Sequence, residues 1–505
     1  MKLVIAEKPS VAMALASVLG ARTRKDGYVE GNGYIVSWCV GHLVGLCDAS
    51  EYDEKYKKWR YEDLPIVPEC WKHKILEGTK KQFGILKKLM RDSKVDEVIC
   101  ATDAGREGEL IFRLVYEQAG CKKPMKRLWI SSMEEQAIKD GFSSLKDGSC
   151  YDSLYQSALC RAKADWLVGI NASRLFSVLY NQNLKVGRVQ TPTLAMIVDR
   201  NQKIKEFTKE KYYMAHIKFD DMDAVTEHFQ KKEDADKVAA ECQERMCEVE
   251  KDDVKEKTVR PPKLYDLTTL QREANRMFGY TAQQTLDAVQ EMYEQKLVTY
   301  PRTDSQYLTD EMGESTETLI QMLLGKMPYA EGLEYQPDVS KVLNSKKVSD
   351  HHAIIPTVEV AKADIGKLKE RNCKILYLIS ARVLTATADP YIYESHKCQI
   401  TCNYHTFYLS AKKTKQEGFK TIEKKLKQFF GIIAEKEEPE LDIWAGKHYG
   451  PCDSFVSEHF TQPPKQYTED TLLSAMERAG NEELTEDTEK LSLIHISEPT
   501  RLGMI

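Results

Sequence analysis

Apolar residues in the N-terminal part of the chain follow two periods, that of strands and that of helices. Three short, mainly apolar runs predict buried strands, at residues 3–6, 34–40 and 95–101. Between these runs the apolar residues recur at helical spacing, as at Val11 and Leu15 after the first run. Strands that alternate with helices are typical of a domain built on a parallel sheet. We therefore expect an α/β fold for this part.

The pattern changes further along the chain. Residues 151–210 favour helical spacing, while residues 211–262 and 386–456 alternate apolar and polar positions as strands do. Residues 263–385, between the two strand-rich blocks, return to helical spacing. Two strand-rich blocks around a helical segment predict a β-region that is split by an inserted domain. The whole chain is thus expected to combine α/β, α and β parts.

The composition is that of a globular protein with an ample core. Of the 505 residues, 42% are hydrophobic and 30% are charged, which is ordinary for a soluble chain of roughly three or four domains. The net charge of −5 gives no overall attraction to nucleic acid. Any DNA-binding surface must therefore be a local groove on an acidic background.

Membrane and secretion signals are not found, and the cysteines point to a reducing cytoplasm. No apolar run reaches the length of a membrane span, and the run at residues 3–6 is broken too early for a signal peptide. The thirteen cysteines are scattered without C-x-x-C pairs. Cys398 and Cys402 lie near His396 and His405, but inside an alternating, strand-like run. We interpret these four as strand residues and expect no zinc.

A tyrosine between a predicted helix and a proline is the first candidate for chemistry. Tyr300 is followed by Pro301 and Arg302 in the run VTYPRTD at residues 298–304. A phenol has a pKa near ~10 and is a weak nucleophile at neutral pH. Attack on a phosphodiester therefore needs a nearby cation, which Arg302 can supply. From these residues alone, a tyrosine packed at the edge of a core is the more common alternative.

Acidic residues follow two of the predicted strands, at the end where α/β sheets place their sites. Glu7 follows the first strand and Asp103 the third, and Glu107 comes four residues after Asp103. Three converging carboxylates are costly unless a hard cation neutralises them, and Mg²⁺ with retained waters fits best. Lys8 can act as a point charge or proton donor at a phosphate oxygen. For Glu107 and Glu109 a surface position at a helix start remains the alternative.

Three segments carry residues suited to nucleic acid. Arg161 and Asp165 lie one turn apart on a predicted helix, where they can also form a simple ion pair with each other. Trp59 lies in a run of basic and aromatic residues, which is either a solvated loop or a platform that stacks a base. The third segment is a small-residue turn that suits close backbone approach to phosphates: Gly187, Arg188, Val189, Gln190, Thr191 and Pro192.

Two further features are open to more than one interpretation. Residues 267–297 predict two helices joined by a turn at Gly279, an arrangement that binds DNA in some proteins and is only structural in many others. His351 stands between Asp350 and His352 at the start of an apolar run. A lone histidine in a core is usually structural, whereas a surface histidine beside an aspartate can titrate near neutral pH.

Together these motifs resemble those of a known family, the type IA DNA topoisomerases, and within it the bacterial topoisomerase III branch. The motifs occur in the family's order and are spread over most of residues 1–460, so the resemblance does not rest on one segment. They are residues 5–10 (IAEKPS), 101–109 (ATDAGREGE), 186–192 (VGRVQTP), 299–302 (TYPR) and 350–357 (DHHAIIPT).

The resemblance implies a toroid made of four parts. These are a TOPRIM metal-binding domain, a split helical gate domain that binds DNA, a split β-arch, and an inserted winged-helix-like domain that carries the tyrosine. We expect them, respectively, at residues 1–150, at 151–210 with 457–490, at 211–262 with 386–456, and at 263–385.

The resemblance also implies roles for the candidate residues. Tyr300 would attack one DNA strand, forming a 5′-phosphotyrosine and freeing a 3′-hydroxyl, while Arg302 and Lys8 stabilise the charged phosphate. Glu7 and Asp103, with Glu107, would hold Mg²⁺, and Glu7 would also be catalytic. His351 matches the family's histidine near the nucleophile. The positions that fall where the family contacts single-stranded DNA are Trp59, Arg161, Asp165, residues 187–192 and Arg302.

The implied function is strand passage without ATP, because the covalent link retains the bond energy. It would relax negative supercoils and separate catenated DNA, acting on single-stranded segments of such DNA in the cytoplasm of a bacterium, at its nucleoid. Neither a membrane nor a particular protein partner is implied.

The chain departs from the family pattern at two places. Gly105 stands where the family's Asp-x-Asp-x-Glu motif often has its middle carboxylate, so metal binding must rest on Glu7, Asp103 and Glu107. Residues 491–505 resemble no part of a topoisomerase and look like translated library-adapter sequence joined to a truncated gene.

Two classes of function therefore stay open, together with a weaker third. The first is a strand-passing enzyme, and the second is a truncated chain that binds and nicks single strands without completing strand passage. The third is another TOPRIM enzyme, such as a primase or nuclease. Those enzymes act through metal-bound water or a nucleotide hydroxyl, which leaves the Tyr300 motif unexplained.

Overall fold

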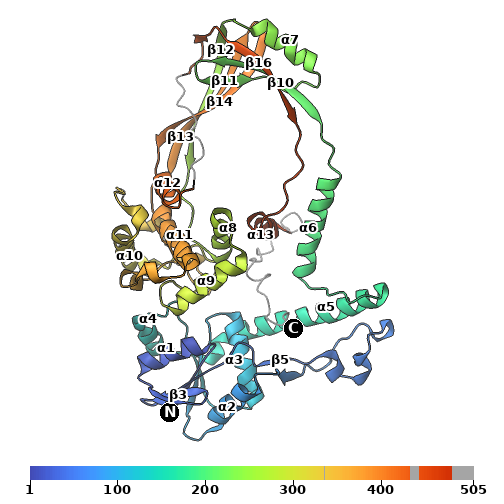
Figure 1. The fold of residues 1–505 in the computed structure, drawn as a ribbon. Coiled ribbons are helices and arrows are strands. Elements are labelled where there is room, and N and C mark those ends of the chain that lie inside the picture. Colours follow the sequence, from blue (N-terminus) through green and yellow to red (C-terminus); the bar gives the residue numbers. More distant parts are fainter. Residues whose placement is uncertain (335, 433–442, 480–505) are drawn as a thin grey trace.

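The chain forms a ring, with an α/β base at one end and a β-sheet at the other (Figure 1). The structure is a computed structural model that describes residues 1–334, 336–432 and 443–479. Helical segments join the base to the sheet on both sides of the ring. The combination of α/β, α and β parts agrees with the sequence pattern. The expected tail at 491–505 and residues 480–490 of the expected helical gate lie outside the described residues.

The base is built on a seven-stranded sheet in the order β2-β3-β4-β1-β7-β8-β9. Its four central strands are parallel: β4 (Tyr34–Trp38), β1 (Lys2–Ala6), β7 (Glu97–Ala101) and β8 (Met125–Arg127). Three outer strands pair antiparallel: β2 (Thr23–Lys25), β3 (Tyr28–Gly31) and β9 (Lys146–Asp147).

Helices cover both faces of this sheet. One face packs against α1 (Pro9–Leu19) and α4 (Glu135–Ser143), and the other against α2 (Lys80–Arg91) and α3 (Arg106–Ala119). Successive residues of β1 therefore enter two different cores, which explains why the run at residues 3–6 is apolar without alternation. The carboxyl ends of β1 and β7 lie side by side, since Ala6 pairs with Ala101.

A long helix leads away from the base and is flanked by an irregular arm. This helix, α5 (Asp152–Tyr180), follows the short helix η4 (Gly148–Tyr151). The arm contains β5 (Val44–Leu46), β6 (His73–Ile75) and the short helices η1 (Ala49–Glu51), η2 (Glu54–Lys57) and η3 (Tyr61–Asp63). Trp166 of α5 fixes the arm by donating its indole N–H to the Cys47 carbonyl, at 2.9 Å. Helix α6 (Gln190–Lys205) then rises toward the far sheet and has no buried residue.

The far end of the ring is a second seven-stranded sheet in the order β15-β12-β13-β14-β11-β10-β16. Its strands are β10 (Lys211–Phe219), β11 (Met222–Val225), β12 (Cys247–Val259), β13 (Tyr391–Cys402), β14 (His405–Gln416), β15 (His448–Tyr449) and β16 (Asp453–Phe460). Helix α7 (Lys232–Cys242) packs on β10 and β16. His396, Cys398, Cys402 and His405 are strand residues, as interpreted from the sequence.

A helical part lies between this sheet and the base and carries Tyr300. Its longer helices are α8 (Leu267–Phe278), α9 (Ala282–Glu294), α10 (Gly313–Lys326), α11 (Glu370–Ala386) and α12 (Lys420–Phe429). Its short helices are η5 (Asp310–Met312), η6 (Pro328–Ala330), η7 (Val339–Val342), η8 (Ser345–Lys347), η9 (Val358–Ala361) and η10 (Ile365–Lys367). Helix α13 (Glu469–Arg478) packs on α8, where Asp470 accepts from Arg272 and Arg276.

The predicted pair of helices with a glycine turn is present as α8 and α9. Asp266 caps α8 by accepting from the Thr269 amide at 2.7 Å, and Gly279 ends the helix with φ 69°, a conformation that favours glycine. Thr281 and Gln284 then form a capping box that starts α9. The turn and the capping box set where α9 begins. The helix ends at Glu294, six residues before Tyr300. None of the helices within the described ranges is long and apolar enough to cross a membrane.

Candidate active site

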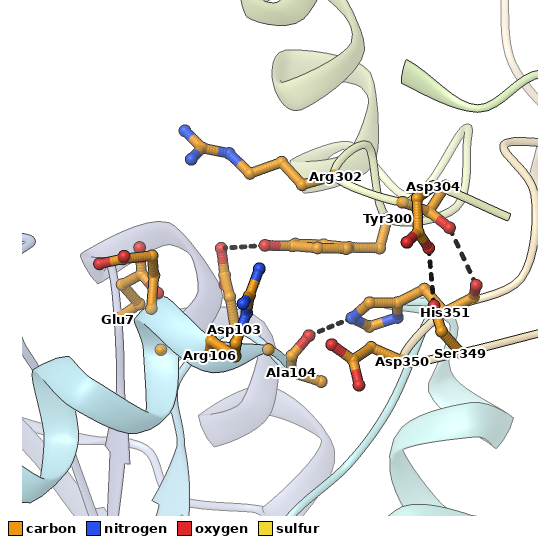
Figure 2. A pocket seen from close by; sticks show the side chains of 14 residues that line it. Glu7, Asp103, Ala104, Arg106, Tyr300, Arg302, Asp304, Ser349, Asp350 and His351 are labelled. Atoms are coloured by element: carbon orange, nitrogen blue, oxygen red, sulfur yellow. Dashed lines mark hydrogen bonds between the residues drawn. The ribbon is translucent and has the colours of Figure 1, made fainter. Parts of the chain in front are cut away.

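Tyr300 lies in the loop after α9, at the contact between the helical part and the base (Figure 2). Its residue is only 6% exposed, and its amide donates to the Ser131 carbonyl of the base at 3.0 Å. Its hydroxyl lies 3.4 Å from Asp103 Oδ2 and donates to it. The ring packs edge-on against Tyr293 and lies 4.3 Å from the His351 ring. The phenol is therefore fixed by both parts and directed at a carboxylate.

Glu7 and Asp103 form a half-buried carboxylate pair at the ends of β1 and β7. Burial, and next the charge of Asp103, raises the pKa of Glu7 to about 8, although Arg302 and Lys8 counteract this. Burial likewise raises the pKa of Asp103. Two carboxyl groups that repel each other in a dry site hold a proton between them at neutral pH or accept a cation. The structure thus brings together the two acidic residues that the strand ends predicted.

A buried arginine, which was not predicted from the sequence, holds the end of β7 in place. Arg127 donates to the carbonyl oxygens of Thr102 and Asp103, each at 2.7 Å. Its charge is balanced by Glu109, 3.2 Å away, which also pairs with Arg113 at 2.8 Å. Glu109 is 1% exposed, so its interpretation as a surface acid is wrong. The four-residue spacing of Glu109 and Arg113 was the one available signal.

The turn after Asp103 depends on one glycine but not on its neighbour. A Cβ at Gly108 would lie 2.0 Å from the Asp103 carbonyl oxygen, so only glycine fits. A Cβ at Gly105 would meet nothing within 4 Å, and its φ of 164° is extended backbone open to any residue. The absence of a carboxylate at Gly105 is therefore not imposed by space or backbone.

Glu107 lines the same pocket but faces a different partner. Its carboxylate lies 3.3 Å from His42 Nε2. Burial tends to raise the pKa of Glu107, but His42, Arg161 and Arg302 together bring it below its usual value. Among the residues that the structure describes, no three His, Cys, Asp or Glu side chains are arranged to hold a metal ion. Glu107 thus lines one cavity with Glu7 and Asp103 while its carboxylate pairs with His42, a residue that the sequence did not indicate.

His351 is a buried neutral histidine, which decides between the two interpretations that the sequence left open. It is 2% exposed, and burial lowers its pKa to about 3. Nε2 contacts the carbonyl oxygen of Ala104, so the ring proton lies there and Nδ1 accepts from the Ser131 hydroxyl at 2.8 Å. The sequence around His351 does not show this burial, because both partners belong to the base, more than 200 residues away in the chain. His351 joins the tyrosine loop to the turn after Asp103.

Two cations flank the carboxylates. The Lys8 ammonium lies 3.0 Å from Glu294 Oε1, at the end of α9. Arg302 lowers the pKa of Glu7 and Glu107, so its charge reaches both. Figure 2 shows the Arg302 side chain extending from the tyrosine loop toward the side of Glu7. Arg302 lines a cavity of about 60 Å³ together with Glu7, Asp103, Glu107 and Tyr300.

The candidate DNA contacts lie along α5 and α6 and on the arm. Asp165 pairs with Arg188 through both carboxylate oxygens, at 2.6 and 3.3 Å, which links α5 to the turn before α6. The charge of Arg161 lowers the pKa of Glu107. Trp59 is 44% exposed, with the Arg174 guanidinium 5.3 Å from its ring centre. The rest of the predicted turn comprises Gly187, Val189, Gln190, Thr191 and Pro192, of which the last three begin α6.

Comparisons with known proteins match both halves of this arrangement. Residues 2–133 match the Toprim domain, and residues 149–481 match the DNA topoisomerase family. The DNA topoisomerase 3 of Staphylococcus haemolyticus is 38% identical over 488 residues, which cover 95% of this chain and 67% of the relative. This chain belongs to the type IA DNA topoisomerase family.

Further relatives agree with this assignment. The DNA topoisomerase 3 of Shouchella clausii is 40% identical over 524 residues, which cover 97% of this chain and 69% of the relative. The full-length topoisomerase I of Thermotoga maritima matches with a TM-score of 0.71 and 25% identity, over 95% of this chain and 75% of that one. The expected fold class and the ATP-independent type IA topoisomerase function are confirmed, and the alternative of a binding chain is not favoured.

Proposed function

We propose that Tyr300 is the nucleophile of this topoisomerase and that Asp103 and Glu7 move the protons. The observation that carries the proposal is the 3.4 Å contact between the Tyr300 hydroxyl and Asp103 Oδ2, inside a cavity that Glu7 and Arg302 also line. In the cleavage step a bond forms between the Tyr300 oxygen and phosphorus, and the bond from phosphorus to the 3′-oxygen breaks. The products are a 5′-phosphotyrosine and a free 3′-hydroxyl.

Each proton in this step has a group placed to take or give it. Asp103 Oδ2 accepts the phenol proton, since the Tyr300 hydroxyl already donates to it. The 3′-oxygen needs a proton as it leaves, and in the site without metal Glu7 holds one at neutral pH because its pKa is raised to about 8. Rejoining runs both transfers in reverse. Arg302 and Lys8 supply the positive charge that the crowded phosphate requires.

Glu7 and Asp103 are also the residues that would hold Mg²⁺. Toprim domains generally bind this ion. Burial raises the pKa of both carboxyl groups, which is the environment that a divalent cation relieves, so the donor set fits. When bound, the ion would neutralise this pair and help to align the 3′-hydroxyl. The proposal requires neither zinc nor ATP.

The remaining parts of the ring would hold and pass DNA. We expect single-stranded segments of negatively supercoiled or catenated DNA to contact Trp59, Arg161 and Arg188, and thus to reach Tyr300 along α5. The setting would be a bacterial cytoplasm, at the nucleoid. The proposed division of labour is metal binding by 1–150, DNA binding by 151–210 with 457–490, ring opening by the arch of 211–262 with 386–456, and strand attack by 263–385.

Denaturing electrophoresis with end-labelled single-stranded oligonucleotide tests the proposal. A 5′-phosphotyrosine retains the 3′-labelled fragment on the protein and releases the 5′-labelled one. Tyr300→Phe should abolish this adduct and leave single-strand binding within about twofold, because stacking and phosphate contacts are untouched. Tyr293→Phe is the matched control, since that ring packs on Tyr300, and it should keep the adduct. Adduct formed by Tyr300→Phe would overturn the assignment.

A further inference from the structure

A carboxylate from the tyrosine-bearing part is held at the start of α1 in the base. Glu294, the last residue of α9, places Oε1 3.0 Å from the Lys8 ammonium and Oε2 2.9 Å from the Ser10 hydroxyl. Gln290, one turn earlier on α9, donates to Oε1 at 3.1 Å. Each carboxylate oxygen is thus bound by a side chain of the α1 start. Lys8 and Ser10 act together as a two-donor site for one anion.

The electrostatics show that this anion sits close to the catalytic pair. Burial tends to raise the pKa of Glu294, but the hydrogen bonds and charge of Lys8, with Ser10 and Gln290, bring it below its usual value, so the carboxylate is ionised. Its negative charge raises the pKa of Asp103, while Lys8 lowers the pKa of both Asp103 and Glu7. Lys8 therefore neutralises Glu294 at a point where positive charge also acts on the reacting carboxylates.

We propose that Lys8 and Ser10 form a binding site for one phosphodiester of the DNA strand, and that the Glu294 carboxylate occupies this site until DNA displaces it. The proposal rests on the proposed function, which places a strand at Tyr300. A carboxylate and a phosphodiester both offer two anionic or partly anionic oxygens to a cation and a hydroxyl donor. Ser10 would therefore contact DNA, and Glu294 would compete with the DNA phosphate for Lys8 and Ser10.

The exchange links DNA entry to the contact between the two parts of the ring. Lys8 and Ser10 belong to the base, whereas Glu294 stands six residues before Tyr300 in the tyrosine-bearing part. When a phosphate takes Lys8 and Ser10, the two parts lose this pair of contacts. Binding of the strand that is to be cut thus weakens one of the interactions that must break before the ring can open.

Binding of labelled single-stranded oligonucleotide, measured by fluorescence anisotropy, tests the exchange. Tyr300→Phe serves as the background, so that cleavage does not contribute. Adding Glu294→Gln should tighten binding about three- to tenfold, because a part-buried competing charge is removed while the shape is kept. Glu291→Gln is the matched control: it removes the same charge from α9, where Glu291 pairs with Lys369, and should change affinity less than about 1.5-fold. Ser10→Ala should weaken binding.

A double variant separates exchange from simple repulsion. With Lys8→Ala present, Glu294→Gln should no longer tighten binding, since there is no ammonium left to compete for. A gain of the same size in that background, or none in the first, would overturn the proposal. The two proposals can fail separately. If the adduct depends on Tyr300 but Glu294→Gln does not change binding, only the proposed exchange is overturned. If Glu294→Gln tightens binding but the parent chain forms no adduct, only the assignment of Tyr300 as the nucleophile is overturned.

Discussion

The base of the ring and the α5–α6 segment present their functional side chains in opposite ways. In the base, Glu7 and Asp103 follow strands that are buried on both faces, and Tyr300, which packs against the base from the helical part, is 6% exposed. Helix α6 has no buried residue at all, and Trp59 on the arm beside α5 is 44% exposed. Groups that react must be fixed in a dry site where their pKa values shift, whereas groups that hold a flexible strand act from an exposed surface. Damage to the two regions should therefore have different consequences.

The largest effect should follow from neutralising the carboxylate pair. Glu7→Gln with Asp103→Asn should slow cleavage about 100-fold through lost proton transfer. Rejoining should fall at least about tenfold further, because it also needs a cation to align the free 3′-hydroxyl. Single-turnover adduct formation, and its reversal after a salt jump, measure the two rates. Equal losses of the cleavage and rejoining rates would contradict the metal role. Glu107→Gln should slow both rates less than the double variant does, because that carboxylate faces His42.

Two glycines in one turn give the next largest contrast. Gly108→Ala should lower adduct formation on the order of 100-fold, because its Cβ would lie 2.0 Å from the Asp103 carbonyl and would shift that residue. Gly105→Ala should stay within about twofold, since its Cβ points into open space. Circular dichroism would show whether Gly108→Ala still folds. If both variants form the adduct at the same rate, cleavage does not depend on the rigid placement of Asp103 in the base.

A smaller effect is expected on the exposed side of the comparison. Trp59→Ala should weaken single-strand binding about tenfold, the usual loss of one stacked base. Once DNA is bound at saturation, the cleavage rate should be unchanged, because Trp59 lies outside the reacting cavity. Tyr61→Ala in the same arm is the control; Tyr61 is 58% exposed and should matter less. A slower cleavage rate of Trp59→Ala at saturating DNA would show that DNA binding by the arm and the cleavage reaction are coupled.

The smallest effect concerns stability and pH. Folding raises the pKa of Glu7 from 4.5 to about 8, so between these values the unfolded chain loses a proton that the folded chain keeps. Stability from this group is therefore greatest below pH 4.5 and declines as pH rises toward about 8. Without metal, the melting temperature of Glu7→Gln should exceed that of the parent by a margin that grows from pH 5 to pH 8. Added Mg²⁺ should shrink the margin, and a margin independent of pH would refute the buried-proton description.

Sequence reasoning located those residues whose position is decided by local structure. Glu7 and Asp103 were predictable because each follows a buried strand, and parallel strands bring their carboxyl ends to one edge. The five motifs between residues 5 and 357 supplied the family and hence the ring. The burial of His351 could not be decided, because it depends on Ala104 and Ser131, which lie more than 200 residues away in the chain. The pattern of one segment contains no information on such a partner.

The same holds for the charged residues. Arg188 was placed correctly on a turn, but its pairing with Asp165 depends on how α5 and α6 meet. Glu109 looked like a helix-start acid, and only the depth of α3 against the sheet shows that it balances two buried arginines. Long-range pairing of charges follows from packing, which a single sequence does not display.

The Tyr300 amide, bonded to the Ser131 carbonyl across the ring contact, has a consequence for accuracy. In the proposed cycle the severed 5′ end stays attached to this residue while the ring opens and another strand passes. A hydrogen bond tolerates only a few tenths of an ångström of displacement, so it re-forms only when the two parts have returned to register. Reclosure then delivers the 5′ end to the place it left, opposite the waiting 3′-hydroxyl. The backbone of the nucleophile itself thus acts as a check on alignment before the DNA is made whole.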